Sequence, residues 1–217
     1  MQPERKKGLL YIAALALAVF CGVAGYYHFF TGQFVFAAEK LDEGAMKRFL
    51  FFGMDPNGRD RQGRAALTVS AWHDYVRPVK LLLEHGADPD IRDDGGWTPL
   101  MIAASTIYRD EIEQLIRYKG NVGSMSGRMY LIDSGPRTYV MEALLEGGAK
   151  ADAETPEGFT ALAMACYTGR TKAVEVLLKH GADPNHRDSF GNRAWQYNCR
   201  RHAYDDIRAL FAKYGYR

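Results

Sequence analysis

The chain has 217 residues and a formal net charge of +2, which is enough length for one or two domains with a substantial core. Residues 8–36 contain no Asp, Glu, Lys or Arg, and residues 37–217 balance 25 basic against 25 acidic side chains. A neutral domain without a dense basic stripe attracts nucleic acid only weakly, so we expect no nucleic-acid partner.

The first predicted element is a membrane segment. A basic head at residues 1–7 precedes an apolar run of seventeen residues, Leu9 to Gly25. Extended to Phe30, the run reaches the roughly 20 residues that a bilayer-spanning helix requires. We therefore predict a transmembrane signal anchor over residues 8–30, with the head in the cytoplasm and the rest of the chain outside it, in the periplasm of a bacterium. The alternative is a secretory signal cleaved near Ala24, which would release the domain into the periplasm.

A repeat follows the predicted anchor. One glycine recurs at intervals of 28 to 34 residues, and a Gly-x-x-x-Leu motif recurs upstream of it. The glycines are Gly53, Gly86, Gly120, Gly148, Gly181 and Gly215, and the motifs are GRAAL (63–67), GWTPL (96–100), GRMYL (127–131) and GFTAL (158–162). Two independent markers with a common period of about 33 residues indicate a repeat protein.

Each repeat has the pattern of two short helices. The segment TALAMACYTG (160–169) predicts a first helix, and KAVEVLLKHG (172–181) places apolar side chains at the i, i+3 and i+4 positions of a second. Gly181 supplies the left-handed residue that ends this second helix. Because such a pair cannot bury its apolar face alone, it must stack on further copies.

These segments resemble the ankyrin repeat family. GWTPLMIAA (96–104) is similar to that family's Thr-Pro-Leu-His-x-Ala-Ala signature, and GFTALAMACYTGRTKAVEVLLKHGADPN (158–185) matches the repeat almost throughout. The resemblance implies an all-α solenoid of about six helix-turn-helix units with hairpin loops over residues 33–217, preceded by the one transmembrane helix. The expected units are 33–60, 61–93, 94–126, 127–155, 156–188 and 189–217.

Two of these units depart from the family pattern. The fourth is short and lacks the Ala-Ala-x-x-Gly stretch, so we expect a truncated first helix and an irregular loop around residues 132–138. The last has Trp195 in place of the motif leucine and ends in YGYR, as a terminal cap does.

The most regular motif, His-Gly-Ala-Asp-Pro, occurs at residues 85–89 and 180–184. A histidine in the last helical turn suits the carbonyl end of the helix dipole, and an Asp before Pro fixes a turn. A metal site would need several such ligands to converge, whereas these histidines lie in different repeats. We therefore predict a structural role for the motif, and no metal or cofactor.

Cys166 and Cys199 lie 33 residues apart, at equivalent positions of adjacent repeats. Stacked helices lie about 8–10 Å apart, which exceeds the reach of a disulfide. We predict two unpaired and largely buried thiols that behave as small apolar side chains.

No catalytic motif is present in the sequence. We find no nucleophile elbow, phosphate loop, zinc-ligand spacing or dinucleotide fingerprint. His73, His186 and His202 each have an Asp nearby, but sequence proximity alone does not make a catalytic dyad. We therefore expect no enzyme and no small-molecule substrate.

The expected contact surface is the concave face of the solenoid, formed in this family by hairpin tips and first helices. Its positions hold Trp, Phe, Tyr and Arg, the residue types enriched at interface hot spots. The candidate partner-binding residues are Arg64, Trp72, His73, Trp97, Phe159, Tyr167, Arg200 and Arg201. An alternative for Trp97 and Phe159 is packing between repeats.

The resulting hypothesis is a non-enzymatic interaction module, held at the membrane on its extracytoplasmic side, that binds another protein. Its narrower form is an immunity-type inhibitor of a toxin or a membrane-acting enzyme. The alternative is an accessory factor that stabilises a periplasmic enzyme or an envelope complex.

Overall fold

The computed structural model describes residues 29–105, 138–197 and 201–215, with side chains placed for all of them except 201–204. Regular structure in these ranges is helical, joined by loops that contain isolated β-bridges. The elements are a helix at residues 29–39, here called the N-terminal helix, and α2 (Glu43–Phe51), α3 (Ala66–Trp72), α4 (Val76–Glu84), α5 (Pro99–Ala104), α7 (Thr138–Glu146), α8 (Ala161–Thr168), α9 (Thr171–Lys179), η2 (Ala194–Tyr197) and α10 (Arg201–Lys213).

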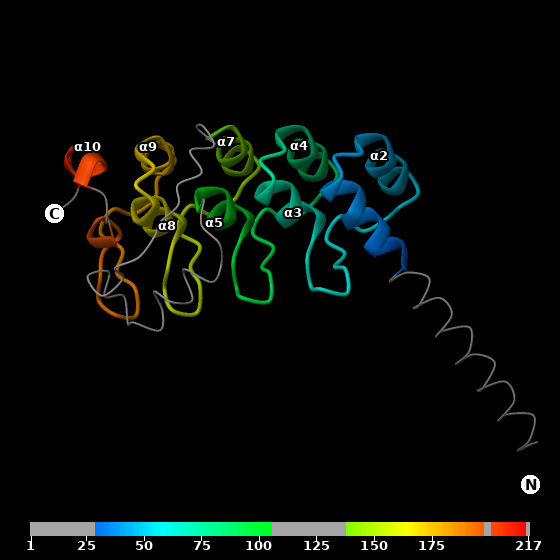
Figure 1. Cartoon of the computed structure of the whole chain (residues 1–217), viewed down its shortest axis with the longest axis horizontal. Helices are drawn as coiled ribbons and strands as arrows, with labels where there is room; N and C mark the ends of the chain where they lie inside the picture. Colours follow the sequence, from blue (N-terminus) through cyan, green and yellow to red (C-terminus); the bar gives the residue numbers. More distant parts are fainter. Residues whose placement is uncertain (1–28, 106–137, 198–200, 216–217) are drawn as a thin grey trace, which may run out of the picture.

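These elements form a stack with three tiers (Figure 1). Helices α2, α4, α7, α9 and α10 lie side by side along one edge, and the short helices α3, α5 and α8 form the tier beneath them. The hairpin loops project from the opposite edge. The stack is therefore a solenoid of helix pairs, as the sequence predicted.

Threonine caps and a glycine fix where the first helices of the pairs begin and end. Thr98 and Thr160 cap α5 and α8, since each hydroxyl accepts a hydrogen bond from a backbone N–H three residues on. Gly169 ends α8 with a φ of 68°, a left-handed conformation that favours glycine. Every residue of α5 and α8 is buried, so these helices form the centre of the core.

The second helices are amphipathic. In α9, Ala173, Val174 and Leu177 face the core, whereas Lys172 and Lys179 are exposed. The same pattern holds in α4, where Val79 and Leu82 are fully buried. Burial on one side only explains why these helices form the outer tier of the stack.

The described residues contain five stacked pairs of inner and outer elements. The division of residues 33–217 into six units stays a prediction, because residues 106–137 lie outside the described residues. Helix α7 packs against α5 and lies between α4 and α9, while α5 itself lies between α3 and α8. Helices α5 and α7 therefore pack together as an inner and an outer element of the stack, and no further pair among the described residues separates them from their neighbours. The predicted units 94–126 and 127–155 both include part of residues 106–137, so the boundary between them lies outside the described residues.

Side-chain hydrogen bonds between neighbouring hairpins confirm this register. The backbone N–H groups of Asp88 and Asp183 donate to Asn57 Oδ1 and Asp152 Oδ1, at 2.7 and 2.8 Å, and each bond spans 31 residues. The equivalent bond, from Lys150 N–H to Asp90 Oδ1 at 2.9 Å, spans 60 residues. The hairpins that contain Asp90 and Lys150 are therefore neighbours in space, although 60 residues separate the two bonded positions.

The predicted anchor, residues 8–30, lies outside the described residues except for its last two. Phe29 and Phe30 are instead the first described residues of the N-terminal helix, and the Phe30 ring packs on Phe49 of α2 with 6.3 Å between ring centroids. Within the part of the chain that the structure describes, no helix has both the length and the apolar character needed to cross a membrane.

Candidate functional site

The hairpins at the edge of the candidate contact surface share one pattern of hydrogen bonds, in which an Asp side chain accepts from backbone N–H groups of its own hairpin. The Oδ1 atom of Asp60 accepts hydrogen bonds from the N–H groups of Gln62 and Arg64, both at 2.9 Å. Asp93 and Asp188 bind their own hairpins in the same way, two and four residues on. These closed turns make the hairpins stiff supports for whatever side chains they carry.

Arginines line the hairpins at the repeat spacing. Arg59, Arg92 and Arg187 each donate to the carbonyl oxygen four residues on, at 2.9, 2.9 and 2.7 Å. Arg92 also reaches the Glu154 carbonyl oxygen of the next hairpin, at 2.7 Å. Sequence analysis did not select these exposed arginines. The available signal was their position four residues before the turn glycines Gly63, Gly96 and Gly191.

Arg64 is a half-buried member of the predicted set. Its guanidinium forms ion pairs with Asp60 at 2.9 Å and with Glu39 of the N-terminal helix at 3.3 Å. These two carboxylates fix the side chain across the first and second units. Arg64 therefore contributes to the join between units, and a role in partner contact stays a prediction.

Trp72 and His73 lie on the surface at the end of α3. Trp72 is 42% exposed. The His73 ring is also exposed and stacks on Tyr75, with 5.2 Å between centroids and 15° between ring planes. These three neighbouring rings form an aromatic surface at the turn after α3, and their role in partner contact stays a prediction.

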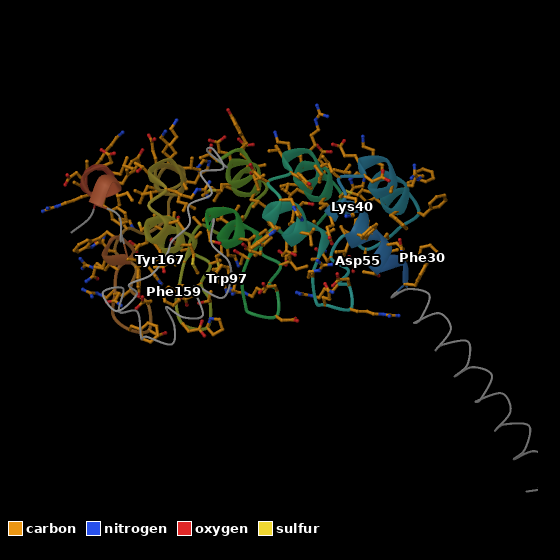
Figure 2. All side chains as sticks on the ribbon, in the orientation of Figure 1. Phe30, Lys40, Asp55, Trp97, Phe159 and Tyr167 are labelled. Atoms are coloured by element: carbon orange, nitrogen blue, oxygen red, sulfur yellow. The ribbon has the colours of Figure 1, made fainter. Side chains whose placement is uncertain are left out.

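Trp97, Phe159 and Tyr167 lie in the core, which corrects their assignment to the contact surface. Their exposed fractions are 7%, 1% and 4%. Figure 2 labels all three residues near α5, α8 and the loops beneath them. Phe159 packs against Phe190 and Tyr197 of the next unit, with ring centroids 6.1 and 5.4 Å apart. The alternative of packing between repeats holds for Trp97 and Phe159, and Tyr167 is enclosed because α8 is buried on every side.

The last two predicted contact residues, Arg200 and Arg201, cannot be placed on a surface. Arg200 lies outside the described residues, and Arg201 is the first residue of α10, with no side chain described. Their role in partner contact stays a prediction.

The His-Gly-Ala-Asp-Pro motif has the structural role that the sequence predicted. His85 Nδ1 and His180 Nδ1 are 2.8 and 2.9 Å from the carbonyl oxygens four residues earlier in their helices. Asp88 and Asp183 each accept a hydrogen bond from the N–H two residues on, which closes the following turn. The described ranges hold no group of three or more His, Cys, Asp or Glu side chains arranged to bind a metal ion.

Two buried groups with shifted pKa values also belong to the scaffold. Burial raises the pKa of the free Cys166 thiol, so the thiol stays protonated. Burial, and then hydrogen bonding to the Asp188 carboxylate, raise the pKa of Tyr197, whose hydroxyl donates to Asp188 and accepts from Asn192. Cys199 lies outside the described residues.

The stack of helix pairs, stiff hairpins and exposed aromatic turn defines a class of repeat solenoid, and comparison with known families identifies it. A family model described as ankyrin repeats in three copies matches residues 34–126 and again 129–217. The chain belongs to the ankyrin repeat family.

Several curated proteins are similar to this chain. A protein of Escherichia coli (strain K12) named as an ankyrin repeat protein, YahD, is 24% identical over 193 residues, which cover 84% of this chain and 96% of YahD. The Caenorhabditis elegans ankyrin repeat and KH domain-containing protein mask-1 is 33% identical over 135 residues, 59% of this chain. The Fowlpox virus (strain NVSL) ankyrin repeat protein FPV222 is 29% identical over 138 residues, 62% of this chain.

The relatives differ in how much of their length the match includes. The matched region is 18% of the fowlpox protein and 5% of mask-1, so for these two only the repeats are shared. What the matches have in common is the ankyrin repeat, a protein–protein interaction module. At this level the chain is a module that binds proteins.

Proposed function

We propose that this chain is a non-enzymatic module that captures one partner protein through its hairpins and its exposed aromatic turn, while an N-terminal anchor holds it on the extracytoplasmic side of a membrane. The observation that carries the binding role is the exposed Trp72 beside the stacked His73–Tyr75 pair. Aromatic side chains on a rigid support bind with little loss of conformational entropy, which is why they dominate interface energetics.

Replacement of Trp72 and His73 by alanine tests the binding surface. Both side chains are exposed, so the double variant should fold normally and lose partner capture in affinity purification from detergent-solubilised membranes. The matched control is Tyr139→Ala on α7, which removes a ring that is 67% exposed in the outer tier. Equal capture by both variants would refute this surface.

The proposed anchor rests on the uncharged run Leu9–Gly25 and the basic head before it. Two measurements on the full chain test it. Retention in the membrane fraction after alkaline carbonate extraction tests insertion, and a C-terminal alkaline phosphatase fusion tests the side of the membrane. Sequencing of the mature N-terminus separates an uncleaved anchor from a secretory signal cleaved near Ala24.

Two effects of binding on the partner protein can be distinguished once that protein has been identified. An immunity-type inhibitor should abolish the activity of a toxin or membrane-acting enzyme at equimolar concentration. An accessory factor should leave the activity intact and raise the partner's melting temperature, since binding to the folded state stabilises it. An activity assay and a thermal unfolding curve on the same complex separate the two.

A further inference from the structure

The two ends of the stack expose different kinds of side chain. Exposed positions of α10 at the C-terminal end are Asp205, Asp206, Arg208, Ala209, Ala212 and Lys213. This polar outer face is what a solenoid needs where no further unit covers its core.

The N-terminal end is aromatic instead. Seven large apolar side chains are exposed among the described residues, and five of them lie between residues 29 and 52. They are Phe29 (56%), Phe36 (50%), Leu41 (46%), Phe51 (83%) and Phe52 (82%), here called the aromatic end. A concentration of exposed apolar surface of this kind marks an interaction site.

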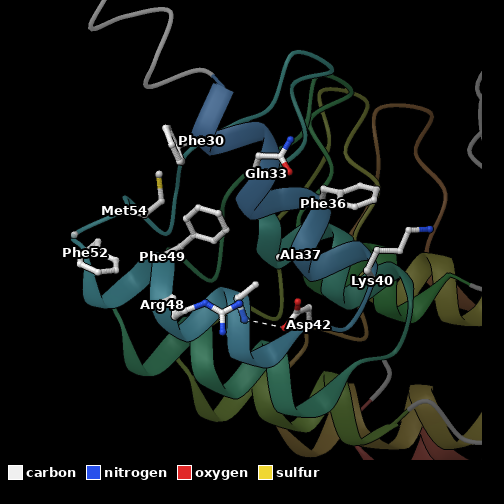
Figure 3. Close-up of a pocket in the computed structure, with 12 residues that line it drawn as sticks. Phe30, Gln33, Phe36, Ala37, Lys40, Asp42, Arg48, Phe49, Phe52 and Met54 are labelled. Atoms are coloured by element: carbon white, nitrogen blue, oxygen red, sulfur yellow. Dashed lines mark hydrogen bonds between the residues drawn. The ribbon is translucent and has the colours of Figure 1, made fainter.

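A cavity of about 850 Å³ opens between the N-terminal helix and α2 at this end (Figure 3). Phe30, Phe36, Phe49, Phe52 and Met54 line it, and Lys40 and Arg48 lie at its margin. The rings of Phe30 and Phe34 both pack edge-on against Phe49, which fixes one wall. The end of the stack is thus an apolar recess and not a closed cap.

Charge at this end favours neither a polyanion nor a polycation. Residues 39–48 carry three acidic and three basic side chains, namely Glu39, Asp42, Glu43, Lys40, Lys47 and Arg48. An occupant of the recess must therefore be held by apolar contact more than by net charge.

The position of this end in the chain indicates its occupant. The apolar run Leu9–Gly25 ends four residues before Phe29, where the described structure begins. Four extended residues span at most about 14 Å, so a membrane-inserted run would hold Phe29 within that distance of the bilayer surface. The bilayer is then always within reach of the aromatic end, whatever the concentration of other proteins.

We propose that the aromatic end inserts into the interface of a phospholipid bilayer, with Phe29, Phe51 and Phe52 among the acyl chains and lipid segments in the recess beside Phe49. This inference rests on the anchor of the proposed function and deepens it. The contact stands the stack on its N-terminal end, so that the hairpins and Trp72 lie further from the membrane along the stack.

Fluorophores at two sites test the contact in the full chain. Phe52→Cys and the matched control Tyr139→Cys are each labelled with an environment-sensitive dye, in a background with Cys21→Ala and Cys199→Ala, since fully buried Cys166 escapes labelling. The chains are reconstituted in phosphatidylcholine vesicles with or without nitroxide-labelled acyl chains. We expect blue-shifted emission and nitroxide quenching at position 52 and neither at position 139.

Further substitutions test whether insertion into the bilayer causes the quenching at position 52. Phe51→Ser should reduce quenching at position 52, because it removes a neighbouring ring that is also inserted, whereas Tyr139→Ser should leave quenching unchanged. A blue shift without quenching that grows with the protein-to-lipid ratio would assign the aromatic end to a second copy of the chain and overturn the proposal.

Flotation of the same vesicles after alkaline extraction separates the two levels of failure. Chains that float but show no quenching at position 52 would refute only the bilayer contact of the aromatic end. Chains that do not float would refute the anchor, and the bilayer contact with it.

Discussion

At the scale of single residues, one side-chain oxygen joins each hairpin to the next. Asn57, Asp90 and Asp152 each present an Oδ1 atom to the backbone N–H of the following hairpin, at 2.7 to 2.9 Å. Only an acceptor is required, so an amide and a carboxylate serve equally well. This explains why the repeated position holds either Asn or Asp in the sequence.

Asp152→Ala tests the contribution of one such bond. Loss of the acceptor should lower the free energy of unfolding by about 1 kcal/mol, the usual net value of a hydrogen bond in water-accessible surroundings. Urea denaturation followed by circular dichroism measures it. Asp152→Asn keeps an oxygen acceptor, as Asn57 does, and should lose much less; an equal loss in both variants would mean that charge, and not the hydrogen bond, stabilises the join.

At the scale of elements, glycines allow neighbouring hairpins to approach closely. Gly158 has a φ of +83°, and a Cβ added there would lie 2.9 Å from Asp188 Cα and 3.0 Å from Ser189 N. Gly181 has almost the same φ, +87°, but no atom lies within 4 Å of its added Cβ. The two positions share a backbone conformation and differ only in what surrounds them.

Alanine substitutions at Gly158 and Gly181 separate the energetic cost of backbone strain from the cost of disturbed packing. Gly181→Ala should cost about 1–2 kcal/mol, the penalty for a left-handed L-residue. Gly158→Ala should cost clearly more, because it also pushes two hairpin backbones apart. Urea midpoints for the two variants measure the difference, and equal midpoints would show that the hairpins separate without cost.

Sequence periodicity located the described helix pairs, but it does not determine how residues 94–155 divide into units. The glycine and Gly-x-x-x-Leu markers correctly located the helix pairs on both sides of residues 106–137. Gly120 and GRMYL, at residues 127–131, lie outside the described residues, so the unit boundary that they indicate stays a prediction. A period records spacing along the chain, whereas the packing of α7 on α5 depends on contacts that spacing does not encode.

Replacement of residues 106–137 by a three-residue linker tests this register. The linker of the unit that follows, between α8 and α9, spans only Gly169 and Arg170. Because α5 and α7 contact each other directly, the shortened chain should unfold in one cooperative transition with the remaining helices intact, as judged by circular dichroism and urea denaturation. A broad or two-step transition would show that the packing of α7 needs the removed segment.

Prediction of the contact surface was less successful, for a physical reason. Aromatic residues at variable repeat positions serve either a partner or the next unit, and residue type does not distinguish the two uses. Trp72 ends α3 at the surface, whereas Phe159 follows a hairpin and packs on Tyr197 of the next unit. Only the arrangement of neighbouring units decides which ring stays exposed.

At the scale of the whole molecule, the stack is polar at one end and apolar at the other. Among the described helices, the main contacts join neighbouring units, so stability is distributed along the stack as a series of local interfaces. The C-terminal unit has the four-residue 3-10 helix η2 where α3, α5 and α8 occupy the other units. Its outer helix, α10, therefore rests on α9 and on the shortest inner element.

Because this inner element is short, we expect the solenoid to unfold first at its C-terminal end. Amide hydrogens of α10 should exchange with solvent before those of α8 and α9, because the terminal unit can detach without disturbing the pairs behind it. Opening then proceeds from the polar end toward the aromatic end, one interface at a time. A proteolytic cut near the C-terminus would consequently shorten the solenoid and leave its remaining units folded.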